Sequence, residues 1–200
     1  AEAENADVIL LIGTNLRWEA PLINTRIRKA TWKKGARVFA IGPEKDQTYK
    51  TTWLGDDAAL VAKLPKAAAD ALKGAERPLI ILGGGGLAVS GVHGAALALA
   101  KTVNAVKDGW NGFSVVHMAA SRMGGLMLGY AQPGGIKDIV AAKPKLAFFL
   151  GADEVDFAAL PDTFKVYVGH HGDKGAHAAD LILPAAAWTE KDFTTVNTEG

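Results

Sequence analysis

Two short apolar runs decide the fold of this chain: DVILLIG at Asp7–Gly13 and RVFAIG at Arg37–Gly42. Each run is continuously apolar and is bounded by polar residues, as expected for a parallel strand that is buried on both faces. Between them, Pro21 suits the first turn of a helix, and an apolar stripe that includes Ile27 continues up to Gly35. The stretch therefore predicts a right-handed β-α-β unit.

The same pattern recurs later in the chain. The later runs are PLIIL at Pro78–Leu82, KLAFFLG at Lys145–Gly151, FKVYVG at Phe164–Gly169 and LIL at Leu181–Leu183. Strands that alternate with helical stretches are typical of parallel sheets covered by helices. We therefore predict an α/β fold class with two doubly wound, mainly parallel, three-layer αβα units.

The boundary between the two units is predicted at KGAE, Lys73–Glu76, which we interpret as a linker. Residues 1–74 would then form the first α/β unit and residues 75–200 the second. We expect the first unit to be incomplete at its N-terminus and the second at its C-terminus. The chain would then be a piece of a longer polypeptide, because it lacks an initial Met and stops inside a motif.

The ends of several strands are also predicted. Gly13, Gly151 and Gly169 each stop an apolar run abruptly, and a turn at the carboxyl end of a strand often needs φ values that only glycine adopts cheaply. Proline has no N–H for a ladder hydrogen bond, so Leu181–Leu183 should end before Pro184.

The composition excludes several classes of function. The 200 residues are 49% hydrophobic, and 22 Lys and Arg balance 21 Asp and Glu to give a net charge of +1. This balance does not favour nucleic acid or an anionic membrane as a partner. The apolar runs are all shorter than the roughly 20 residues that span a bilayer, so we expect no direct membrane insertion. The chain has no cysteine, which excludes disulfides, thiolate zinc sites and iron–sulfur clusters within it.

A glycine run follows the strand Pro78–Leu82. Gly83, Gly85 and Ala88 satisfy the dinucleotide pattern G-x-G-x-x-A, whose backbone N–H groups can hold a pyrophosphate. The pattern also needs an acidic residue at the end of the next strand, and Asp108 does not follow an apolar strand. The run is also similar to the central domain of thiamine-diphosphate enzymes. We favour a tight structural turn and keep nucleotide or thiamine-diphosphate binding as an alternative.

A cluster of ligand-competent side chains lies in the stretch GHHGDKGAH. His170, His171, Asp173 and His177 are residue types that bind zinc. Their glycine-broken spacing differs from the i, i+2 or i, i+4 spacing of metal sites on regular elements. We therefore predict a loop at the mouth of the sheet and no metal site.

Two groups of charged side chains have a structural and a functional interpretation. One consists of Asp153, Glu154 and Asp156, which suit acid–base chemistry but lie where a first helical turn favours acidic residues. The other consists of Arg26, Arg28, Lys29, Lys33 and Lys34, on or just after the predicted first helix. We favour structural roles for both groups, and keep a docking patch for an acidic partner as the alternative for the basic helix.

Three segments carry a resemblance to a known family. They are IGTNLRWEAP at Ile12–Pro21, LGADEVD at Leu150–Asp156, and AADLILPAAAWTEK at Ala178–Lys191 with NTEG at Asn197–Gly200. Together they resemble the molybdopterin oxidoreductase superfamily, whose turns at strand ends contact a pterin cofactor. The resemblance implies vestigial pterin-type turns at Gly13, Thr14, Asn15, Gly151, Ala152, Asp153, Gly169, His170 and His171, which we expect to be empty.

A narrower resemblance covers nearly the whole chain in order. The strings ILLIGTNLRWEAPLINTRIRKA and VGHHGDKGAHAADLILPAAAWTEK are similar to the large iron–sulfur subunits of proton-pumping NADH:quinone oxidoreductase, respiratory complex I. In bacteria this family is called the G subunit, and in mitochondria the 75-kDa subunit. It implies a parent subunit with iron–sulfur clusters in its N-terminal region, and a fold retained here without cofactor or metal.

The resemblance also implies partners and a location. The partners would be the cluster-bearing region of the same subunit and other peripheral-arm subunits, on the cytoplasmic side of a bacterial inner membrane or the matrix side in mitochondria. The parent complex would be an enzyme that passes electrons from NADH to quinone, whereas this chain alone would not be catalytic. The alternative is a fragment of a catalytic molybdopterin oxidoreductase such as a formate dehydrogenase.

Overall fold

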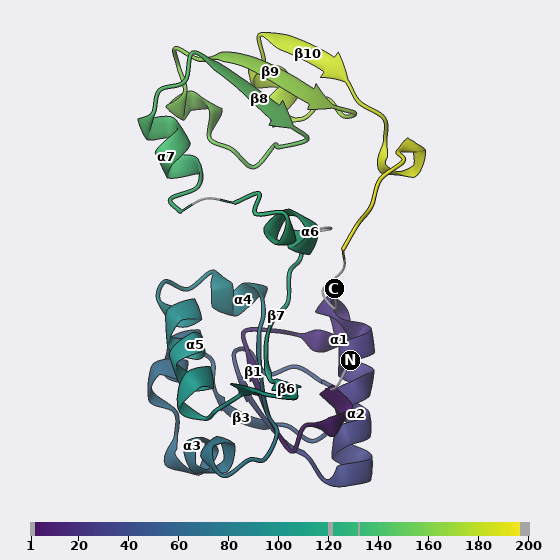
Figure 1. Ribbon diagram of the computed structural model, residues 1–200, viewed down its shortest axis with the longest axis vertical. Helices are drawn as coiled ribbons and strands as arrows, with labels where there is room; N and C mark the ends of the chain where they lie inside the picture. The colour runs from purple at the N-terminus through teal and green to yellow at the C-terminus, as the bar shows by residue number, and fades with distance from the viewer. Residues whose placement is uncertain (1–2, 120–121, 132, 197–200) are drawn as a thin grey trace. The chain divides into compact units, whose positions relative to one another are not determined.

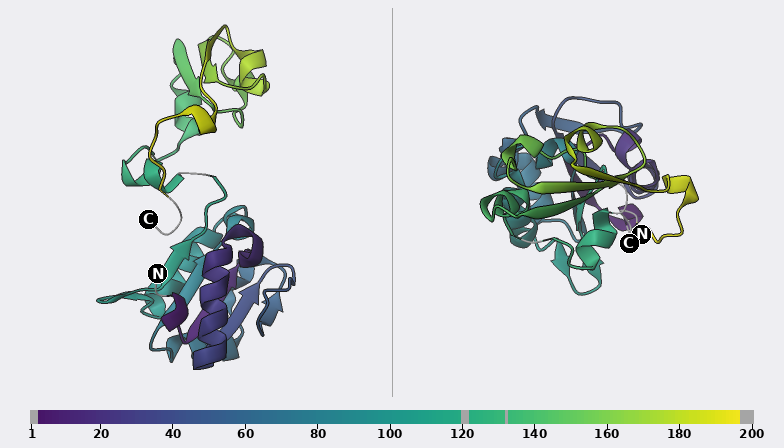
Figure 2. Two further views of the ribbon diagram at one scale, coloured as in Figure 1. Left: turned by 90° about the vertical axis from the view of Figure 1, so that its right-hand side faces the viewer. Right: turned by 90° about the horizontal axis from the view of Figure 1, so that it is seen from above.

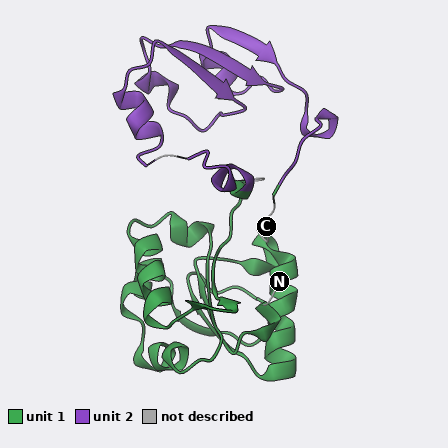
Figure 3. Ribbon diagram, viewed as in Figure 1, with its two compact units in different colours: residues 1–123, 196–200 green, residues 124–195 purple. Residues whose placement is uncertain are grey.

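The chain folds as two units in the computed structural model, which describes residues 3–119, 122–131 and 133–196. One unit comprises residues 1–123 with 196–200, and the other comprises Gly124–Thr195 (Figure 3). The predicted motif NTEG at Asn197–Gly200 lies outside the described residues. Within the described part of the chain, no helix is both long and apolar enough to cross a membrane.

The first unit is built on a parallel five-stranded sheet (Figure 1). Its strands are β1 (Val8–Ile12), β2 (Arg37–Ile41), β3 (Thr52–Gly55), β4 (Pro78–Leu82) and β7 (Phe113–Val115). They lie in the order β3-β2-β1-β4-β7. The chain therefore leaves β1 in one direction and later returns to its other side, which makes this unit doubly wound with a switch point between β1 and β4.

Helices cover both faces of this sheet because the strands are apolar on both faces. Val8, Leu10 and Ile12 belong to one buried cluster and Ile9 and Leu11 to the other. The first face is covered by η2 (Ala58–Lys63), α3 (Lys66–Lys73) and α5 (Val92–Thr102), and the second by α1 (Leu16–Glu19) and α2 (Pro21–Lys34). The left view of Figure 2 shows α2 lying across this second face of the sheet.

Short elements complete the first unit. They are η1 (Ala3–Asn5), α4 (Gly84–Leu87), and a hairpin of β5 (Val106–Lys107) and β6 (Trp110–Asn111). Helix α6 (Arg122–Met127) contains the boundary between the two units.

The predicted division after residue 74 is not the one that the structure shows. Strand β4 pairs with β1 along its whole length, from Val8 with Pro78 to Ile12 with Leu82. Residues beyond 75 therefore complete the first sheet, and the two units meet at Met123 and Gly124. The linker-like stretch Lys73–Glu76 is instead a tight connection from α3 to β4, because the Asp7 carboxylate accepts hydrogen bonds from the main chain at both Glu76 (2.7 Å) and Arg77 (3.0 Å).

The second unit contains a parallel three-stranded sheet in the order β10-β9-β8. Its elements are α7 (Ile136–Ala141), β8 (Leu146–Leu150), η3 (Phe157–Ala159), β9 (Phe164–Gly169), α8 (Lys174–Ala178), β10 (Leu181–Pro184) and η4 (Trp188–Glu190). The α/β class with parallel sheets is thus confirmed in both units. Among the described strands, however, only those of the first unit show the reversal that defines double winding.

Strand ends agree closely with the sequence prediction. Gly13 and Gly151 directly follow β1 and β8, and Gly169 is the last residue of β9. The predicted stop before Pro184 is wrong by one residue, since Pro184 pairs with Gly169 at the end of β10. Its missing N–H is tolerated there because β10 is an edge strand.

One face of the second sheet is apolar and largely exposed, although Val166 at its centre is buried. The register places the side chains of Leu146, Phe148, Leu150, Phe164, Val166, Val168, Leu181 and Leu183 on this face. Phe148 and Leu150 are 60% and 66% exposed. The opposite face packs Phe149 and Tyr167 into a core with Leu160. Parallel sheets are normally covered on both faces, so the exposure of this face departs from that rule.

Candidate functional site

The first predicted turn, Gly13–Asn15, lies at the switch point of the first sheet. Gly13 has a φ of +55°, which favours glycine, and its carbonyl accepts a 2.9 Å hydrogen bond from the N–H of Gly85. A Cβ atom at Gly13 would overlap the main chain of Gly85 and Gly86. The two glycine turns after β1 and β4 therefore close against each other by direct contact of their backbones.

The carboxylate of Glu19 accepts hydrogen bonds from two donors of this turn, one N–H group and one hydroxyl. Its Oε1 atom accepts a 2.7 Å hydrogen bond from the main-chain N–H of Asn15, and its Oε2 atom accepts a 3.0 Å bond from the Thr14 hydroxyl. The single turn of α1 holds Glu19 four residues beyond Asn15, which brings the carboxylate back over the turn. The same carboxylate lies close to the Cα of Gly83, where a Cβ atom would meet it at 2.8 Å.

A pocket of about 300 Å³ opens beside this turn, at the carboxyl ends of β1, β2 and β3. Three carboxylates line it, those of Glu19, Asp56 and Asp57, against the single ammonium group of Lys45. An excess of carboxylates repels phosphate and other anions. The pocket is thus unsuited to the pyrophosphate of a dinucleotide.

A buried glutamine, Gln47, contacts the main chain of this turn. Gln47 is 1% exposed, and its Nε2 donates a weak 3.4 Å hydrogen bond to the carbonyl of Thr14. Its main-chain carbonyl accepts a 3.1 Å hydrogen bond from Asn24 in α2. The hydroxyl of Tyr49 donates a 2.8 Å bond to the same Asn24 side chain, and burial raises the pKa of Tyr49 far above its usual range. These contacts fix the segment after β2 against α2.

The second and third predicted turns meet at one edge of the second sheet. Gly151, with a φ of +61°, donates a 2.8 Å hydrogen bond to the carbonyl of Val168, next to the third turn at Gly169–His171. Asp153 joins the surrounding elements: its Oδ1 accepts a 2.8 Å bond from the N–H of Gly175, and its Oδ2 accepts a 3.0 Å bond from the hydroxyl of Tyr167. Asp153 therefore has an evident structural role.

Tyr167 is the centre of this arrangement. A Cβ atom at Gly169 or Gly175 would overlap its ring, so both glycines are needed for packing. Gly169 lies outside the left-handed φ region, and the reason predicted for this residue is replaced by this close approach. Burial raises the pKa of Tyr167, and the hydrogen bond to Asp153 raises it further.

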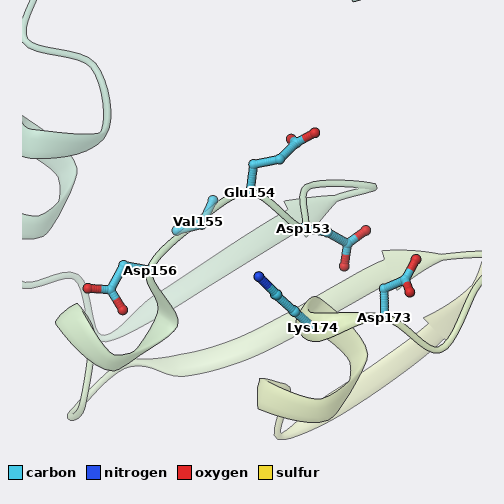
Figure 4. A pocket seen from close by; sticks show the side chains of 6 residues that line it. All are labelled: Asp153, Glu154, Val155, Asp156, Asp173 and Lys174. Carbon is cyan, nitrogen blue, oxygen red and sulfur yellow. The ribbon is translucent and has the colours of Figure 1, made fainter.

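A second pocket, of about 490 Å³, lies over these turns (Figure 4). It is lined by Asp153, Glu154, Val155, Asp156, Asp173 and Lys174. The lining thus carries four carboxylates and one ammonium group, a balance that disfavours bound anions. Asp156 has a structural role as the N-cap of η3, because its Oδ1 accepts a 3.1 Å hydrogen bond from the N–H of Ala158.

The predicted loop is only partly a loop: His170 and His171 lie in an exposed loop, whereas His177 lies in α8, with Asp173 at the N-cap position of that helix. The rings of His170 and His171 lie edge to face with their centroids 4.5 Å apart. Among the described residues, no group of three or more histidine, aspartate or glutamate side chains has the geometry of a metal site. The glycine run at Gly83–Gly86 follows β4 as predicted, but α4 is a single turn, and these glycines serve the close contacts with Gly13, Thr14 and Glu19.

The structure thus brings together two of the three predicted turns, Gly151–Asp153 and Gly169–His171, and places Gly13–Asn15 in the other unit. The sequence prediction omitted Glu19 and Gln47. Glu19 had a detectable signal, because a carboxylate four residues after the asparagine of a strand-end turn can return to that turn. Gln47 had none, since it lies in an irregular segment.

This architecture, with strand-end turns on parallel sheets, agrees with the comparison with known proteins. A family model described as molybdopterin oxidoreductase matches residues 1–200, and the chain belongs to this family.

Closer relatives support the narrower resemblance. The chain is 44% identical, over 98% of its length, to the mitochondrial NADH-ubiquinone oxidoreductase 78 kDa subunit of Neurospora crassa, and 43% identical over 98% to that of Candida albicans. It is 41% identical over its whole length to the G subunit of NADH-quinone oxidoreductase from Rickettsia bellii. These matches cover 27%, 28% and 30% of the relatives, so the chain spans less than a third of each. The similarity to this subunit family, expected from the motifs, is confirmed.

Proposed function

We propose that this chain is a cofactor-free structural module of an NADH:quinone oxidoreductase of the complex I type. Its parent subunit would carry iron–sulfur clusters outside these residues and pass electrons from NADH toward quinone. The observation that carries the proposal is the position of Glu19, whose carboxylate takes the Asn15 N–H and the Thr14 hydroxyl that a bound anion would need.

The physical reason is charge. A molybdopterin dinucleotide carries phosphate groups, and a phosphate about 4 Å from the Glu19 carboxylate would be repelled by about 4 kcal/mol per pair of unit charges at an effective dielectric constant of 20. It would also have to displace charge-assisted hydrogen bonds. The carboxylates that line the second pocket add the same obstacle. The described residues at these turns therefore do not fit the family cofactor.

A role in assembly is supported by the second unit. The sheet face that carries Phe148, Leu150 and Leu183 is apolar and exposed within the described unit. We propose that other parts of the parent subunit cover it, with further peripheral-arm subunits as neighbours. The chain would then sit in the peripheral arm, on the cytoplasmic face of a bacterial membrane or the matrix face of the mitochondrial one.

Metal analysis and calorimetry test the absence of a cofactor site. We expect the purified chain to hold no molybdenum and to give no binding heat with NADH or with molybdopterin guanine dinucleotide. Stoichiometric molybdenum, or a dissociation constant near 1 μM (about −8 kcal/mol), would overturn the proposal in favour of a live molybdopterin enzyme. Glu19→Ala, compared with the exposed control Glu76→Ala, tests the cause: if Glu19 excludes anions, only Glu19→Ala raises the weak affinity for pyrophosphate.

A further inference from the structure

The outer face of α2 carries an unusual pair of features. The helix contains Arg26, Arg28, Lys29, Lys33 and Lys34, and it has no acidic residue from Pro21 to Lys34. Its inner side is defined by the buried residues Asn24, Ile27 and Ala30. On the outer side, Trp32 is 84% exposed and Leu22 is 71% exposed, although both are large apolar side chains.

The positive charge of this face is only partly neutralised within the described chain. Lys29 has a long, 3.8 Å contact with Glu4, and Lys34 donates a 2.6 Å hydrogen bond to the neutral amide of Asn5. For Arg28 and Lys33 no ion pair is formed with any described residue.

A notch of about 540 Å³ adjoins Trp32, between α2 and the segment after β2. Its lining includes Arg28, Lys29, Trp32, Tyr49 and Lys50. The Tyr49 side chain in its lining is held in place, because its hydroxyl donates a hydrogen bond to the Asn24 side chain. The notch thus offers an aromatic wall and three cations, with no carboxylate among its lining residues.

We propose that this α2 face, defined by Leu22, Arg28, Lys29, Trp32, Lys33 and Lys50, is the docking surface for an acidic protein segment. The segment would pair its carboxylates with Arg28, Lys33 and Lys50 and pack an apolar side chain against Trp32. Tryptophan and arginine are the residues that most often carry the binding energy of protein interfaces. The inference does not rest on the proposed function, because a parent with a bound cofactor would present the same surface.

The dimensions favour a protein over other anionic partners. Leu22 and Trp32 are ten residues apart on one helix, a distance of about 15 Å, which is beyond the reach of one small ligand. A flat membrane would leave the notch beside Trp32 unfilled, and the two apolar side chains do not form the continuous apolar face of an interfacial helix. The net charge of +1 for the whole chain gives no general attraction to nucleic acid.

Carbodiimide cross-linking of the full-length parent protein in its native cells tests the proposal, because this reagent joins amines directly to carboxylates. We expect Lys29, Lys33 or Lys50 to be joined to an aspartate or glutamate outside residues 1–200, with the flanking peptide identified by mass spectrometry. Arg28→Glu and Trp32→Ala leave these lysines in place, and each should lower the yield about tenfold or more, as for a hot-spot residue. Trp188→Ala is the matched control, because Trp188 is 72% exposed in the other unit, and it should leave the yield unchanged.

Two results would overturn the proposal. One is the absence of such cross-links, or a yield that Arg28→Glu and Trp32→Ala do not change. The other is Trp32-dependent binding of the purified chain to phosphatidylserine vesicles or to a single-stranded RNA oligonucleotide without any protein cross-link, which would assign the α2 face to lipid or nucleic acid.

Discussion

The carboxylate of Glu19 accepts a 2.7 Å hydrogen bond from the main-chain N–H of Asn15, so the chain supplies its own anion to the turn after β1. In related folds such turns bind phosphate groups through free N–H donors. Here the donor is already engaged, and a second bond to the Thr14 hydroxyl holds the carboxylate in place. The turn is thus a structural joint between β1, α1 and the glycine run after β4.

Removing this carboxylate should destabilise the first unit. Glu19→Ala leaves the Asn15 N–H and the Thr14 hydroxyl without their acceptor, and hydrogen bonds to charged groups contribute about 1.5–3 kcal/mol each when well buried. Because the turn is only half-buried, we expect a loss of about 1–2 kcal/mol in the free energy of unfolding. Urea denaturation measures it, with Glu76→Ala as the exposed control. Equal stability of the two variants would show that the bonds to Glu19 are energetically silent.

The contact between the two glycine turns should tolerate no side chain. Gly13→Ala places a Cβ atom against the main chain of Gly86 at a φ of +55°, so we expect a loss of about 3 kcal/mol or more in stability. Gly94→Ala is the matched control, since Gly94 lies in α5 with no atom near its Cβ position, and alanine should stabilise that helix by up to about 1 kcal/mol. Thermal unfolding of both variants checks the prediction, which fails if they shift in the same direction.

The buried hydroxyl of Tyr49 predicts a dependence of stability on alkaline pH. Its pKa is raised by burial in the folded chain and is near 10 when unfolded. The stabilisation is therefore complete below pH 10 and is lost as the pH rises above it, because only the unfolded chain releases the proton. Tyr49→Phe should lower the free energy of unfolding at pH 7 by about 1–2 kcal/mol, because the Asn24 side chain loses the hydroxyl that donates to it. Urea denaturation measures this loss. The variant should also show a shallower decline between pH 9 and about 11 than the native chain, and parallel declines would contradict this origin.

His117 predicts a dependence on acidic pH. Its Nδ1 atom is buried without a hydrogen-bond partner among the described residues, and desolvation, with a smaller effect of Arg122, lowers its pKa in the folded chain. Stability should therefore fall as the pH drops below about 6.5, where the unfolded chain takes up a proton and the folded chain does not. His117→Gln should weaken this fall, as measured by urea unfolding at pH 7.5 and 5.5. His93→Gln is the control, and equal slopes in the two variants would refute the assignment to His117.

Much of the fold was predictable because the strands are short apolar runs with clear ends. DVILLIG, RVFAIG, PLIIL and KLAFFLG all contain strands in the structure, and Gly13 and Gly151 directly follow two of these strands as expected. The domain boundary was not predictable from local composition. The pairing of β4 with β1 is a contact between segments about 70 residues apart, and a linker-like stretch such as Lys73–Glu76 looks the same whether it joins two domains or two strands of one sheet.

The candidate site was predictable in position but less so in chemistry. Motif resemblance located Gly13–Asn15, Gly151–Asp153 and Gly169–His171 at strand ends, where the structure has them. The role of Glu19 depends on the geometry of one helical turn, and the role of Gly169 depends on the ring of Tyr167. Both are contacts between side chain and backbone that residue spacing alone does not specify.

The molybdenum and pterin content of the full-length parent protein, purified from its native cells, tests the central claim most directly. If the turns hold no cofactor, the preparation contains iron and no molybdenum above the level of the buffer, and its fluorescence shows no oxidised pterin. A preparation with about one molybdenum atom and one pterin dinucleotide per chain, both lost in a Gly13→Ala or Asp153→Ala variant that still folds, would contradict the account and make these turns a working cofactor site.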